Sequence, residues 1–260
     1  MANTKSAIKR IRRISKQTAV NKIRKSRVSN ENSSTKKVFE TLDTSASKSE
    51  LFISSYQNYL VYGVTALVVI FALYFSYDKF VVQPKIDESN VEIFTAQKYF
   101  DLALNSTNNK DSLYNLSLKG ADGKFGFLDI IENYSGTPAS NISYYSSGMA
   151  YYHLKKYDLA IEYLGKFSSK DDVLNSLSLT TIGDSFIQLN QFEDALDYYQ
   201  KALKSTSNSF TSPIILLKAG DVSLKIGNNK KALSFFNKIK TDFPKSAEAD
   251  LIDIKIEQSK

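Results

Sequence analysis

The sequence predicts an all-α protein with an N-terminal basic tail, one transmembrane helix and a solenoid of helical hairpins. Three observations carry this prediction. An uncharged stretch, residues 51–77, separates Glu50 from Asp78. The residues before it are strongly basic. Residues 141–246 repeat a glycine, an alanine and a large apolar residue at intervals of 35 and 37 residues.

The tail comprises residues 1–50, which hold eight Lys and five Arg against four acidic residues, a net charge of +9. Residues 1–28 contain ten basic residues and no acid. Three interpretations stay open for this segment. It can contact anionic lipid, bind RNA phosphates, or remain a solvated tail that only sets the orientation of the membrane helix.

The predicted transmembrane helix covers residues 51–78 and depends on the apolar segment Leu60–Phe75. A helix from Tyr59 to Tyr77 is about 28 Å long, close to the hydrocarbon thickness of a bilayer. The alternatives are a cleaved signal peptide, a helix buried in a soluble domain and a re-entrant segment. A signal peptide would require an unusually long basic region, and residues 80–82 offer no small-residue cleavage site.

Charge predicts the orientation of this helix. Basic flanks stay cytoplasmic because the translocation of Lys and Arg is unfavourable, whereas residues 51–260 sum to a net charge of −2. We therefore expect a cytoplasmic tail and an exported C-terminal domain.

The repeats of residues 141–246 each place an alanine twelve residues and a large apolar residue sixteen residues after a glycine. Small residues are expected where two antiparallel helices cross closely, and large residues fill the space around that crossing. A residue nine positions after each glycine is expected to open the second helix. These positions are Gly148, Gly183 and Gly220; Tyr157, Phe192 and Asn229; Ala160, Ala195 and Ala232; and Leu164, Tyr199 and Phe236.

Three such units resemble the tetratricopeptide repeat, in which two antiparallel helices occupy about 34 residues. The middle unit fits best, and the first and third depart from the pattern at Ser147 and Ser223. The resemblance implies a solenoid whose first helices line a concave face that takes extended or helical peptides.

The segments that flank the three repeats are less regular. Residues 79–140 are predicted to hold a linker and a degenerate helical repeat, interrupted at Asn108-Asn109 and ending with a helix from Phe125 to Tyr134. Residues 247–260 are predicted to form a capping helix, because the ends of solenoids need a solvated face.

The candidate site is the groove along the first helices of the three repeats. The candidate partner-binding residues are Tyr145, Met149, Tyr152, His153, Thr180, Asp184, Ile187, Gln188, Leu217, Asp221 and Leu224. Further groove positions hold Ile142, Leu177, Ile214 and Lys225. A mostly apolar lining with two acids suits apolar segments of partner polypeptides. The alternative for any single residue is that it packs against a neighbouring repeat.

No residue pattern in the sequence is typical of an enzyme. The chain has no Cys and a single His, His153, which excludes disulfides, thiolate catalysis and Cys-ligated zinc. Gly120, Gly123 and Gly126 are spaced as neither a dinucleotide fingerprint nor a phosphate-binding loop, so a turn between helices is expected there. We predict no enzymatic activity, no catalytic residue, no cofactor and no metal site.

The chain shows two further resemblances to known families. The start Met-Ala-Asn-Thr-Lys-Ser-Ala, with Lys9-Arg10 and Asn21-Lys22, is similar over residues 1–28 to the ribosomal protein S20 family, which binds 16S ribosomal RNA. From about Val38 onward, the layout resembles bacterial single-span tetratricopeptide proteins of the ancillary Sec translocon subunit type. Residues 111–140 and 147–167 carry that resemblance best.

The second resemblance implies a repeat domain that contacts newly translocated chains or envelope partners. We predict a membrane-anchored adaptor of the bacterial inner membrane, with a cytoplasmic N-terminus and a periplasmic C-terminal domain. It would bind polypeptide or membrane-protein partners through its groove, and the lipid bilayer through Leu60–Phe75. The alternative is an S20-like RNA-binding protein, which depends on residues 1–28 alone. The pattern defines neither the identity of the partner nor an oligomeric state.

Overall fold

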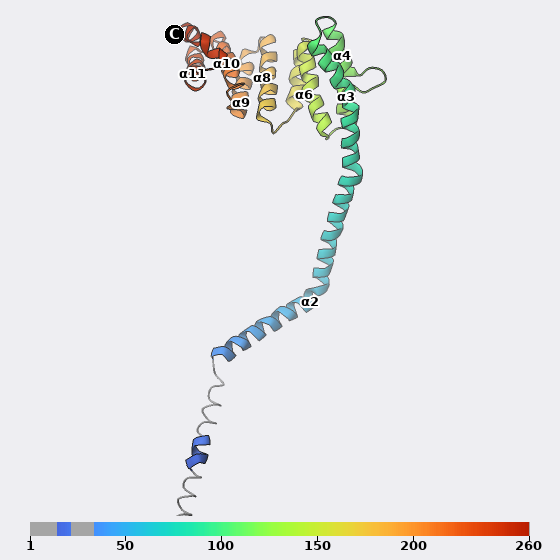
Figure 1. The fold of residues 1–260 in the computed structure, drawn as a ribbon, viewed down its shortest axis with the longest axis vertical. Coiled ribbons are helices and arrows are strands. Elements are labelled where there is room, and N and C mark those ends of the chain that lie inside the picture. Colours follow the sequence, from blue (N-terminus) through green and yellow to red (C-terminus); the bar gives the residue numbers. More distant parts are fainter. Residues whose placement is uncertain (1–14, 22–33, 260) are drawn as a thin grey trace, which may run out of the picture. The chain divides into compact units, whose positions relative to one another are not determined.

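The structure is a computed structural model that describes residues 15–21 and 34–259 (Figure 1). The chain divides into two compact units, Met1–Phe75 and Ser76–Lys260. Within the described ranges every element is helical, apart from an isolated bridge between Ala121 and Lys124. The predicted all-α fold class is therefore confirmed.

The first unit contains a short helix over residues 15–21 and most of α2, Ser34–Tyr77. Helix α2 starts well before the predicted membrane segment, so residues 34–50 of the predicted tail are helical. This stretch contains neither Pro nor Gly, and the Thr44 hydroxyl donates a 2.7 Å hydrogen bond to the Glu40 carbonyl one turn earlier. The predictions for residues 1–14 and 22–33 lie outside the described residues.

One helical stretch in the described part of the chain, starting at Ser54, is long and apolar enough to cross a membrane. None of its 18-residue apolar window is buried against other parts of the structure. The side chains of the predicted segment Leu60–Phe75 are exposed throughout.

The second unit opens with a π-helical turn, Asp78–Val82, and α3, Gln83–Asn105, so most of the expected linker is helical. Pro84 lies in the first turn of α3, directly after the π-helical turn, and it has no N–H to donate to the preceding turn of this continuous helix. Asn109, with a positive φ of 62°, separates α3 from α4, Lys110–Lys119, as the predicted interruption requires.

The glycine-rich segment after α4 forms a turn that leads into α5, Phe127–Asn133. A Cβ atom on Gly126 would lie 2.2 Å from the backbone nitrogen of Gly120, so this turn requires glycine. The prediction of a turn between helices is confirmed here, and α5 ends within one residue of the predicted Tyr134.

Three helical hairpins follow, each made of a first helix and a second helix that packs on it (Figure 1). The second helices begin at the predicted residues. In chain order the helices are α6, Pro138–His153; α7, Tyr157–Lys166; α8, Asp172–Gln188; α9, Phe192–Ser205; α10, Ser212–Lys225; and α11, Asn229–Asp242. The predicted capping segment forms a 3-10 helix, Ala247–Leu251, and α12, Ile252–Gln258.

The turn inside each hairpin has the same geometry. Seven residues after each repeat glycine, Lys155, Asn190 and Gly227 adopt positive φ angles of 60°, 59° and 78°. In all three turns the backbone N–H of the next residue donates a hydrogen bond to the carbonyl five residues earlier, with N to O distances of 2.8 to 2.9 Å. This arrangement satisfies the free carbonyls at the end of the first helix and reverses the chain.

The two helices of each hairpin cross closely at the repeat glycine, as predicted. A Cβ atom on Gly148, Gly183 or Gly220 would lie 2.4, 2.6 or 2.2 Å from a side-chain atom of the large residue sixteen positions later. Those large residues, Leu164, Tyr199 and Phe236, are buried, and so are the three alanines. The solenoid core is built from these crossings, repeated along the chain.

Candidate functional site

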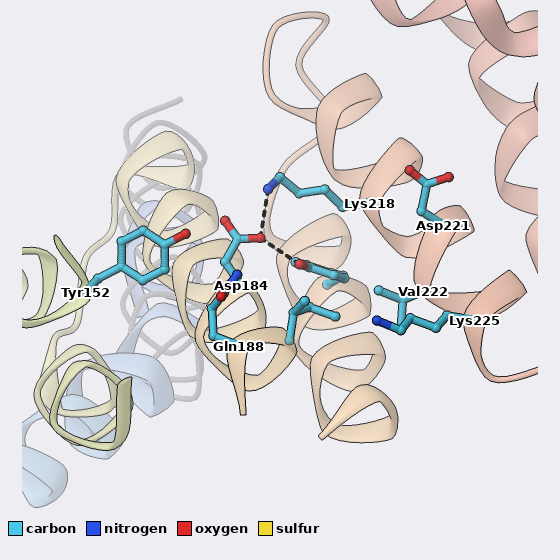
Figure 2. A pocket seen from close by; sticks show the side chains of 9 residues that line it. Tyr152, Asp184, Gln188, Lys218, Asp221, Val222 and Lys225 are labelled. Carbon is cyan, nitrogen blue, oxygen red and sulfur yellow. Dashed lines mark hydrogen bonds and ion pairs between the residues drawn. The ribbon is translucent and has the colours of Figure 1, made fainter. Parts of the chain in front are cut away.

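The first helices of the second and third hairpins, α8 and α10, enclose an open pocket with a volume of about 310 Å³ (Figure 2). Tyr152 contributes from the end of α6, and Tyr199 reaches the pocket from α9. The lining residues are Tyr152, Asp184, Ile187, Gln188, Tyr199, Lys218, Asp221, Val222 and Lys225.

Asp184 lies at the centre of this pocket and joins three helices. Its Oδ1 atom accepts a 2.6 Å hydrogen bond from the Tyr199 hydroxyl of α9 and a 2.7 Å hydrogen bond from the Lys218 Nζ of α10, drawn as dashed lines in Figure 2. Burial and then the nearby charge of Asp184 raise the pKa of Tyr199 far above its ordinary value. The tyrosine therefore remains a hydrogen-bond donor throughout the physiological pH range.

A second acid–lysine pair repeats this arrangement one repeat later. Lys255 Nζ of α12 lies 2.7 Å from Asp221 Oδ1 of α10, as Lys218 of α10 does from Asp184 of α8. The two residues are 34 positions apart in both pairs. Each groove acid is thus paired with a lysine 34 residues later, on α10 or α12, and this ion pair ties the two helices together and neutralises the acid.

Six of the predicted groove residues line the pocket: Tyr152, Asp184, Ile187, Gln188, Asp221 and Lys225. The two acids were predicted as part of the groove lining, and both line the pocket. Their ion pairs also make them part of the contact between repeats.

The other predicted residues take part mainly in packing between helices. Tyr145 packs on Phe167 with ring centroids 5.1 Å apart, and burial raises its pKa. Thr180 is buried, and its hydroxyl donates a 2.6 Å hydrogen bond to the Ser176 carbonyl. Leu217 and Leu224 pack against the core around Phe236, and Met149 is half-buried; these residues do not line the pocket.

His153 lies at the boundary with the degenerate first repeat. Its ring stacks on that of Tyr114 in α4, with centroids 5.0 Å apart and an interplanar angle of 4°. Partial desolvation, together with the positive charge of Lys110, lowers the pKa of His153. The residue is therefore mostly neutral near pH 7 and stacks as an uncharged ring.

Three pocket residues, Tyr199, Lys218 and Val222, were not predicted as site residues. Tyr199 was correctly assigned to the core, but its hydroxyl also reaches into the pocket. The spacing of 34 residues that separates Asp184 from Lys218, and Asp221 from Lys255, was visible in the sequence and could have identified both lysines.

The site contains no arrangement of groups suited to metal binding. Across residues 15–21 and 34–259, no three His, Cys, Asp or Glu side chains lie close enough together to hold a metal ion. The pocket combines aromatic and aliphatic surface with neutralised acids, an arrangement that suits the binding of another chain.

Stacked helical hairpins with a groove along their first helices define a helical-repeat scaffold. Comparison with known proteins identifies the repeats, because residues 143–167 and residues 180–247 each match a family model described as tetratricopeptide repeat. The chain therefore carries tetratricopeptide repeats, which are suited to protein–protein interaction and are typical of non-enzymatic scaffolds.

The chain is also similar to a TPR repeat-containing protein of Methanocaldococcus jannaschii, MJ1428, with 34% identity over 101 residues. The match covers 38% of this chain and 17% of that protein. The comparisons do not support the resemblances to a translocon subunit or to ribosomal protein S20, which stay predictions.

Proposed function

We propose that this protein is a membrane-anchored, non-enzymatic adaptor whose tetratricopeptide-repeat groove binds polypeptide partners on the exported side of a membrane. The open pocket between α8 and α10 is the observation that carries the proposal. Its volume of about 310 Å³ can hold a side chain of a bound chain, and its half-buried surface is mixed aromatic, aliphatic and polar.

The chemistry of the pocket favours reversible contact over catalysis. Asp184 and Asp221 are already paired with lysines, so neither is a free general base. A bound chain gains mainly from burial of apolar surface against Ile187, Val222 and Tyr152, at about 25 cal/mol per Å².

The proposed anchor is the apolar part of α2. Large apolar side chains along the helix, such as Phe71, Leu73 and Phe75, are exposed. Insertion into lipid removes this surface from water. The basic residues of the tail favour a cytoplasmic N-terminus, so the proposed location is a bacterial inner membrane with the repeats in the periplasm.

Anchoring raises the local concentration of the groove near the membrane, where newly exported chains emerge. This layout supports a role in protein translocation or envelope assembly. The proposal involves no cofactor and no RNA.

Photo-crosslinking tests the groove directly. A photoreactive amino acid at Gln188, which is exposed in the pocket, should capture polypeptides in cells. The matched control is the same amino acid at Lys201, which is exposed on a second helix and outside the pocket. Equal capture from both positions, or capture of RNA-dependent ribosomal partners, would contradict the proposal.

A further inference from the structure

The C-terminal segment of the chain repeats the groove register of the preceding first helices. A shift of 37 residues relates Asp184 to Asp221 and Lys218 to Lys255, and both ion pairs have the same 2.7 Å length. The same shift relates Ile215 to Ile252, and both are buried. Residues 247–258 therefore form the first helix of a further half-repeat, in addition to their role as a cap.

The position in this segment that corresponds to the repeat glycine differs from that of the preceding first helices. Glu257 stands where Gly220 stands in α10, so the position that allows a close crossing is no longer small. Asp253 forms an exposed 2.6 Å ion pair with Lys240 of α11. α12 thus continues the row of first helices, and it carries polar groups such as Asp253 on exposed surface.

An apolar row runs across the beginnings of these first helices. Leu177, Ile214 and Leu251 occupy equivalent positions 37 residues apart, and they are 38%, 36% and 64% exposed. Leu177 and Ile214 lie seven residues before Asp184 and Asp221, which places them two turns away on the same helix faces. Phe210, just before α10, is 76% exposed and extends the apolar surface at the same end.

The opposite edge of the groove carries the cation Lys225. Asp184 and Asp221 are neutralised by Lys218 and Lys255, but Lys225 forms no ion pair with the described residues. Its Nζ atom lies over the ring of Phe192, 4.2 Å from the centroid, and its side chain is exposed. A carboxylate on a bound partner would complement the positive charge of this edge.

We propose that the groove binds an acidic amphipathic helix of a partner polypeptide, with its apolar flank on Leu177, Ile214 and Leu251 and its acidic flank at Lys225. This inference rests on the proposed function and specifies the partner. The two edges are eleven residues apart on α10, or about 16 Å. A bound helix is about 10 to 12 Å wide with its side chains, and the extended Lys225 side chain covers the rest of the distance between Ile214 and Lys225. A single extended strand is narrower.

Synthetic peptides of 18 residues test this inference against the full chain in phosphatidylcholine nanodiscs, with empty nanodiscs subtracted. One peptide is a helix with a Leu flank and a Glu flank. The others replace Glu with Lys, scramble the order, or insert prolines that prevent a helix. Fluorescence anisotropy should show the tightest binding for the Leu/Glu helix.

Two groove variants and one control then assign the contacts. Leu251→Asp should weaken binding of the Leu/Glu helix about tenfold. Lys225→Glu should weaken it about fivefold and shift the preference toward the Leu/Lys helix. Lys201→Glu, a charge reversal outside the pocket, should leave binding unchanged. Ile214→Ser repeats the apolar test, and circular dichroism verifies that each variant is folded.

The possible failures are distinguishable. If no peptide binds, the proposed function is contradicted along with the inference. If the Leu/Glu, Leu/Lys and proline-containing peptides bind equally, or if the Leu251 and Lys225 variants bind like the wild type, the groove still binds polypeptide and only the acidic-helix inference is overturned.

Discussion

Replacing a glycine at one of the close helix crossings changes the free energy of unfolding in two opposing ways, through helix propensity and through core packing. Replacing Gly220 with Ala adds a methyl group whose carbon would lie 2.2 Å from Cε1 and 2.7 Å from Cζ of Phe236. Real contacts of this kind do not occur below 3.0 Å, so the ring must move. Phe236 is fully buried between α10, α11 and α12, where little space is available for that movement.

The two terms have opposite signs. Alanine is favoured over glycine in a helix by about 1 kcal/mol. Overpacking of a well-packed core costs about 1 to 3 kcal/mol, and the upper part of that range applies because two ring atoms are affected. We therefore expect Gly220→Ala to lower the free energy of unfolding by about 1 to 2 kcal/mol, and Tm by about 4 °C.

Gly165→Ala is the matched control. Gly165 is also helical, in α7, but a Cβ atom there would have no neighbour within 4 Å. Only the helix-propensity term remains, so this variant should be about 0.5 to 1 kcal/mol more stable than the wild type. Thermal unfolding of the full chain in detergent, followed by far-ultraviolet circular dichroism, measures both changes.

Stabilisation of the protein by Gly220→Ala to the same extent as by Gly165→Ala would contradict the predicted clash with Phe236. A second measurement identifies the cause of any loss. In the Gly220→Ala background, Phe236→Leu should cost less stability than it costs in the wild type, because the smaller side chain relieves the contact.

Three other variants test the site and the core. Lys218→Met should lower the free energy of unfolding, measured in urea, by about 1 to 2 kcal/mol, because it leaves the partly buried Asp184 without its cation. The control Lys201→Met breaks an exposed ion pair and should change this free energy by less than about 0.5 kcal/mol. The pKa of Tyr199 is raised in the folded state, so the folding stability should hold below about pH 10 and fall above it, where the tyrosine ionises in the unfolded chain. Tyr199→Phe should make this fall shallower when Tm is measured against pH. An unchanged slope would contradict the assigned burial. Ser147→Ala removes a buried hydroxyl that has no hydrogen-bond partner, so it should raise the free energy of unfolding by about 1 kcal/mol. The midpoint of urea unfolding should rise with it, and a lower midpoint would contradict this.

The repeat architecture could be predicted because its determinants lie at fixed separations along the chain. A close crossing needs a glycine, and the residue that fills the crossing lies sixteen positions later, so Gly183 and Tyr199 could be paired from the sequence alone. The starts of the second helices followed from the same register.

The site was less predictable because it depends on contacts between repeats. Thr180 and Tyr145 occupy expected groove positions, but neighbouring helices cover them. The 34-residue spacing marks Lys218 and Lys255 as equivalent positions, but the structure is needed to show that each of these lysines meets a groove acid. The early start of α2 was missed because a polar helix gives no apolar periodicity from which to predict it.

The most direct test of the adaptor account is the topology of the chain. An epitope-tagged full-length protein should remain in the pellet after alkaline carbonate extraction, and protease added to intact spheroplasts should digest the repeats while sparing the tail. A charged substitution in the apolar helix, Val69→Lys, is the matched control and should weaken retention. Release of the wild-type chain by carbonate, or repeats that stay protected until the spheroplasts are lysed, would contradict the account.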